Sequence, residues 1–149
     1  KAFLKLAETG QDSKAKFFQE NSLGLDNPFY GQSPLVVDFT DDGKPDMLWL
    51  NMDGPIRAFI NRETGNFVNV VLPDSVASQG TSAYLELDIG NSYTRQLLNS
   101  VGIVTDQSPV LTFGLGDVSS VRAINITGPD GVTVRIANPP INGAIRVAY

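Results

Sequence analysis

Apolar and polar residues alternate along most of this chain, in short segments bounded by glycine, proline, asparagine or aspartate. Such alternation predicts β-strands, because successive side chains of a strand point to opposite faces of a sheet. In the segment 83–89, for example, Leu85, Leu87 and Ile89 share one face. The pattern predicts an all-β fold, with strands at 2–7, 14–18, 34–37, 47–50, 56–60, 66–71, 83–89, 93–98, 101–105, 110–113, 121–127, 132–137 and 145–149.

The predicted strands fall into two groups. Residues 72–80 read LPDSVASQG, and this cluster of proline, serine and glycine is typical of a linker between folded units. We therefore expect a propeller-blade-like antiparallel sheet with a preceding hairpin at 1–78. The segment 79–149 has about six short strands with turn residues between them, which predicts a small β-sandwich or barrel.

Composition narrows the class of protein. A chain of 149 residues, 42% hydrophobic and 18% charged, can form one domain or two small ones and is not expected to be disordered. No apolar run is long enough to cross a bilayer, so we expect no membrane insertion. The formal net charge of −5, without a basic stripe, argues against binding of nucleic acid.

The chain contains neither cysteine nor histidine. Disulfides and thiol nucleophiles are therefore excluded, and the usual zinc ligands and the commonest general base are missing. A pair of carboxylates could still act as acid and base, but their sequence spacing does not support such a pair. We expect a protein that is not an enzyme. The first residue is Lys1, so either a leader was removed or the chain is part of a longer product, and both fit an extracellular location.

The chemistry is concentrated in the acidic loop, which we define as residues 38–46 (DFTDDGKPD). Oxygen donors at alternating positions around a glycine turn suit a hard cation, above all a structural calcium ion. The expected metal ligands are the side chains of Asp38, Thr40, Asp42 and Asp46 and the carbonyl of Lys44. An EF-hand is excluded because strands flank the loop and its twelfth position is Trp49. The alternative is a polar turn in which the aspartates cap their own backbone.

The first half of the chain resembles a known repeat. Residues 16–25 (KFFQENSLGL), the acidic loop, and the segments 57–61 and 65–67 are similar to one FG-GAP/VCBS repeat, the blade unit of integrin-like β-propellers. The resemblance implies calcium binding by the acidic loop, although Thr40 replaces the usual aspartate or asparagine with a weaker, neutral ligand. A propeller needs several blades, whereas roughly one and a half are present, so the exposed strand edges need a cover.

The second half resembles another family. Residues 111–116 (LTFGLG), 121–126 (VRAINI) and 129–131 (PDG) are similar to the ASPIC/UnbV domain, although Gly128 stands where a tryptophan usually precedes Pro-Asp-Gly. This domain commonly follows FG-GAP/VCBS repeats in secreted proteins such as the cartilage acidic proteins. The resemblance brings no established catalytic chemistry.

Together these observations predict a non-enzymatic extracellular structural or adhesion protein with a structural calcium site. Its expected partners are further copies of itself, joined into an oligomer or a filament by β-strand addition, or another extracellular protein or glycan. Two alternatives stay open. The chain could be the C-terminal fragment of a longer integrin-like receptor or matrix protein, or a calcium-dependent carbohydrate-binding module.

Overall fold

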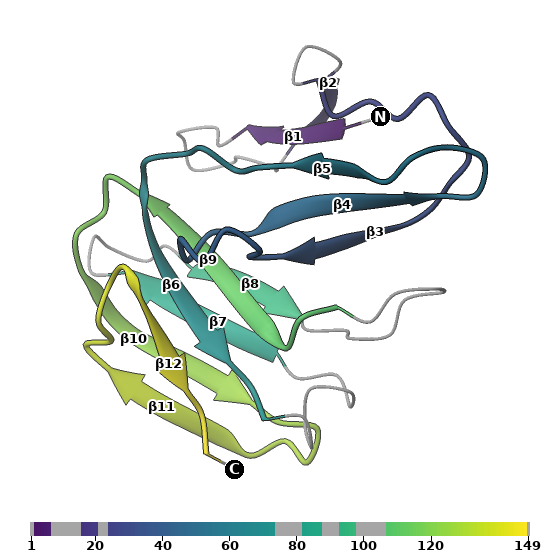
Figure 1. The fold of residues 1–149 in the computed structure, drawn as a ribbon. Helices are drawn as coiled ribbons and strands as arrows, with labels where there is room; N and C mark the ends of the chain where they lie inside the picture. The colour runs from purple at the N-terminus through teal and green to yellow at the C-terminus, as the bar shows by residue number, and fades with distance from the viewer. Residues whose placement is uncertain are drawn as a thin grey trace.

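The computed structural model describes residues 2–6, 16–20, 24–73, 82–87, 93–97 and 107–148. Every regular element in these residues is a β-strand, which confirms the expected all-β fold (Figure 1). The described part of the chain accordingly holds no helix that could cross a membrane. The strand expected at 101–105 lies outside the described residues.

The strands agree with the alternating pattern and differ from it mainly at their ends. β6 and β10 have the expected bounds, while β3 begins at Gly31 and so includes three residues before the predicted start. The strands are β1 (Ala2–Leu6), β2 (Lys16–Glu20), β3 (Gly31–Val37), β4 (Asp46–Asn51), β5 (Arg57–Phe59), β6 (Asn66–Val71), β7 (Ser82–Leu87), β8 (Tyr93–Leu97), β9 (Val110–Gly116), β10 (Val121–Thr127), β11 (Thr133–Ala137) and β12 (Gly143–Arg146).

The described strands form four open sheets, and none of these sheets closes into a barrel. Two strands make up the hairpin β1–β2, and three make up the sheet β3–β4–β5. The other two sheets have the orders β12–β6–β9 and β11–β10–β7–β8. All pairs are antiparallel except β12 and β6, which run parallel.

β6 joins the two groups of strands that the sequence distinguishes. The pattern places residues 66–71 with the first group, but β6 lies between β9 and β12 and hydrogen-bonds to both. Three successive residues, Val68, Asn69 and Val70, are buried, so both faces of β6 are covered. Continuous burial of this kind is typical of a central strand.

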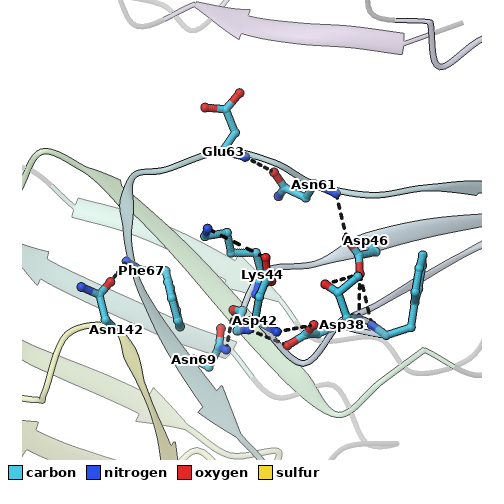
Figure 2. Close-up of polar contacts among 12 residues, drawn as sticks. Asp38, Asp42, Lys44, Asp46, Asn61, Glu63, Phe67, Asn69 and Asn142 are labelled. Carbon is cyan, nitrogen blue, oxygen red and sulfur yellow. Dashed lines mark hydrogen bonds and ion pairs between the residues drawn. The ribbon is translucent and has the colours of Figure 1, made fainter.

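The hydrophobic core lies between the sheet containing β6 and β9 and the sheet containing β10. One cluster of buried side chains includes residues from all three strands, so the two sheets pack face to face in the manner of a β-sandwich. Its members are Val68, Val70, Leu72, Leu111, Phe113, Leu115, Val121, Ile124, Ile126 and Val147. The three-stranded sheet β3–β4–β5 carries the acidic loop, which projects toward β6 (Figures 1 and 2).

Candidate cation site in the acidic loop

The acidic loop connects β3 to β4, and the pairing of Val37 with Asp46 closes its base. Two of its residues adopt left-handed backbone conformations, Asp41 with φ of 58° and Gly43 with φ of 85°. Glycine enters this region without steric cost, and aspartate tolerates it better than most side chains. The Asp-Asp-Gly sequence therefore allows the chain to reverse within a few residues.

Asp46 is the internal acceptor that holds the loop together. Its side chain is 2% exposed, and its Oδ2 accepts hydrogen bonds from the amide of Phe39 (3.2 Å) and from the amide and hydroxyl of Thr40 (3.2 and 3.1 Å). Its Oδ1 accepts a fourth from the amide of Asn61 at 2.8 Å (Figure 2). Burial of a carboxylate is costly without such partners. Asp46 thereby ties the start of the loop to the segment that follows β5.

Asp38 and Asp42 also accept hydrogen bonds from the loop's own backbone. The two carboxylate oxygens of Asp38 accept from the amides of Asp42 (3.2 Å) and Gly43 (2.7 Å). Oδ1 of Asp42 accepts from the amide of Lys44 at 3.0 Å, and its Oδ2 lies 3.9 Å from the Lys44 ammonium. These are the contacts that the alternative of a self-capping polar turn describes.

The tip of the loop is docked on β6. Nδ2 of Asn69 donates to the carbonyl of Gly43 at 2.7 Å, and a Cβ built on Gly43 would lie only 2.2 Å from Cζ of Phe67. The amide of Phe67 in turn donates to Oδ1 of Asn142, in the turn before β12. Sequence reasoning did not identify Asn69 as part of this site. Its only signal was a polar residue between two core valines.

A cation would find a partial set of ligands in this arrangement. Each carboxylate oxygen offers about two acceptor sites, so the oxygens of Asp38 and Asp42 that accept one amide each keep capacity for a metal. The Thr40 hydroxyl donates its proton to Asp46 and keeps its lone pairs. Together with the Lys44 carbonyl, these oxygens fit a hard cation in their chemistry.

Asp46 fits the role of ligand less well. Its Oδ2 already accepts three hydrogen bonds and the side chain is buried, so little acceptor capacity faces outward. Among the described residues, no three or more acidic, cysteine or histidine side chains gather closely enough to hold a metal. The loop therefore presents oxygen donors of the right kind without a closed cage of carboxylates.

Comparison with protein families identifies the family to which the second half of the chain is similar. Residues 75–149, which are 75 of the 149 residues, match the ASPIC and UnbV family model. The chain belongs to the ASPIC/UnbV family. The matched region contains β7 to β12, so the middle strand of the sheet β12–β6–β9 comes from outside the ASPIC/UnbV match. No curated protein matches the chain. The resemblance of residues 16–67 to an FG-GAP/VCBS repeat stays a prediction.

Proposed function

We propose that this ASPIC/UnbV chain is a non-enzymatic structural or adhesion protein of the extracellular space, stiffened by a calcium ion in the acidic loop. The ion would be bound by the side chains of Asp38, Thr40 and Asp42 and by the Lys44 carbonyl. Asp46 would support the loop from inside. The observation that carries the proposal is that these surface oxygens keep acceptor capacity on a loop docked firmly on β6.

The way the loop uses its carboxylates favours a structural role over catalysis. Both oxygens of Asp38 and of Asp46 accept hydrogen bonds from main-chain amides or from Thr40. A general acid or base must instead reach a reacting group of a substrate. The ASPIC/UnbV membership supports the extracellular location, because this domain is found in secreted proteins with integrin-like repeats.

The two edges of the sheet β3–β4–β5 differ in how readily a further strand could pair with them. Along β3, the carboxamide of Gln107 donates to the Pro34 carbonyl (2.9 Å) and accepts from the Val36 amide (3.0 Å). Pro34 also lacks an N–H, so both features oppose addition of a strand to this edge. β5 lies at the other edge and pairs, among the described strands, with β4 alone.

We propose that a strand from a second copy of the chain extends the sheet at β5. The donor would be the β1–β2 hairpin, which forms a separate two-stranded sheet. Strand addition supplies main-chain hydrogen bonds along a whole edge, and a head-to-tail contact that does not close yields a filament. Completion by the rest of a longer polypeptide would use the same edge.

Sedimentation and electron microscopy of the purified chain test the assembly. We expect the sedimentation coefficient to rise with protein concentration and fibres or oligomers to form. A variant lacking residues 1–20 should then stay monomeric, because it lacks the donor hairpin. Monodisperse monomers at every concentration of the chain that retains residues 1–20 would contradict self-assembly.

A further inference from the structure

A depression lies between the acidic loop and the sheet β12–β6–β9. Three carboxylates line its loop side, those of Asp38, Asp41 and Asp42. Its other side is lined by two apolar residues, Phe67 and Ala144, and by two side-chain amides, those of Asn69 and Asn142. Thr40 and Asp46 are not among the lining residues. The depression therefore lies on a different side of the loop from the buried Asp46 carboxylate.

Asn69 contributes a buried acceptor without a donor. The residue is 8% exposed, and its side chain points from β6 toward the loop (Figure 2). Its Nδ2 is used by the Gly43 carbonyl, but its buried Oδ1 accepts no hydrogen bond from the described residues. The opposite orientation of the amide would place two acceptor oxygens against each other, so the assignment of Oδ1 is fixed by its neighbour. A buried carbonyl oxygen of this kind is stabilised when a donor reaches it.

The charge around this acceptor selects a cationic donor. Asp41 and Asp42 are exposed, and Asp42 forms an ion pair with Lys44 at 3.9 Å. The Asp41 side chain makes no hydrogen bond or ion pair with the described residues. A ligand in the depression would therefore meet uncompensated negative charge on the loop side and would lie beside the Asn69 amide on the sheet side.

The spread of these groups favours an organic cation over a metal ion. The described residues include no group of three or more metal-ligating side chains that could hold a metal ion, and Thr40, a proposed calcium ligand, does not line the depression. A guanidinium presents five N–H donors in a plane and can reach separated acceptors. The ring of Phe67 and the methyl group of Ala144 offer apolar contact for the aliphatic part of such a side chain. We propose that the depression binds an arginine side chain of a partner polypeptide.

Titration of the isotope-labelled chain followed by NMR tests this proposal. The probe is N-acetyl-arginine methylamide, and the matched control is N-acetyl-citrulline methylamide, which replaces the guanidinium with a neutral urea. We expect the arginine probe to shift the side-chain amide signals of Asn69 and the backbone signal of Gly43 in a saturable manner. The citrulline probe should bind at least about fivefold more weakly, because it lacks the charge. Equal affinity for the two probes, or no response to either, would overturn the proposal.

Asp41→Asn is the variant that isolates the depression. Asparagine tolerates the left-handed backbone at this position, and Asp41 is not among the proposed calcium ligands. The variant should lower the affinity for the arginine probe by about two- to fivefold. Asp117→Asn, which removes an exposed charge outside the depression, should leave that affinity unchanged. Equal affinities in both variants would refute the assigned site.

Titrations with and without calcium distinguish the arginine site from the proposed calcium site. Asp38 and Asp42 belong to both sites, so the titration is repeated in chelator and in calcium. An arginine response in chelator supports the depression whether or not the loop binds calcium. If calcium alone shifts the Asn69 and Gly43 signals, the proposed metal site stands and the arginine site is rejected.

Discussion

Gly43→Ala measures how closely the acidic loop packs against β6. An L-residue at φ of 85° pays about 1–2 kcal/mol for its left-handed backbone. The added Cβ would also lie 2.2 Å from Cζ and 2.5 Å from Cε2 of Phe67, and such overpacking typically costs about 1–3 kcal/mol. The sum is a destabilisation of about 2–5 kcal/mol. For a chain of this size that corresponds to a fall in Tm of about 4–20 °C.

Thermal unfolding followed by circular dichroism provides the assay, and two further variants divide the loss into its parts. Gly131 has φ of 80°, and a Cβ added there would meet no atom within 4 Å, so Gly131→Ala has the backbone cost alone. Adding Phe67→Leu to Gly43→Ala should recover the steric part. If Gly43→Ala loses no more stability than Gly131→Ala, the Phe67 ring does not press on the loop and the docking of the loop on β6 is incorrect.

The contacts of Asp46 and of Gln107 each predict a loss of stability on substitution. Asp46→Asn should lower the free energy of unfolding in urea by about 2–4 kcal/mol, because one acceptor oxygen of a buried charged group becomes a donor. Asp53→Asn, at a site with one exposed hydrogen bond, should lose less than about 1 kcal/mol. Equal losses in the two variants would refute the role of Asp46 in tying the loop to the segment after β5. Gln107→Glu keeps the acceptor for Val36 but sets a carboxylate against the Pro34 carbonyl. It should cost about 1–2 kcal/mol in thermal unfolding, and an unchanged Tm would show that this side chain does not secure the β3 edge.

The strands could be predicted from sequence because alternation is a local property of a sheet with two different faces. β9 shows this directly, since Leu111, Phe113 and Leu115 are buried while Gly114 between the last two is exposed. The partner of each strand could not be predicted in the same way. The parallel pairing of β12 with β6 joins segments more than 70 residues apart, and no local pattern encodes it. β6 lies before the expected boundary at 78/79 but pairs with β9 and β12, which lie after it. This pairing is visible only in the three-dimensional structure.

The position of the acidic loop was predictable, whereas the division of work among its residues was not. Spacing alone makes Asp38, Asp42 and Asp46 equivalent oxygen donors. Asp46 differs because the segment after β5 returns the amide of Asn61 to it and buries it, which is a tertiary contact. Asn69 is part of the site for the same kind of reason, since β6 carries it to the Gly43 carbonyl.

Thermal unfolding in calcium and in chelator is the most direct test of a structural calcium ion in the acidic loop. Calcium at about 100 times its Kd would stabilise the folded state by about 2.7 kcal/mol, because it binds the native chain by mass action. The wild-type Tm should therefore rise by about 5–10 °C in calcium, and Asp42→Asn should lose most of that rise while Asp117→Asn keeps it. The same Tm in calcium and in chelator would contradict the presence of a calcium site in this loop.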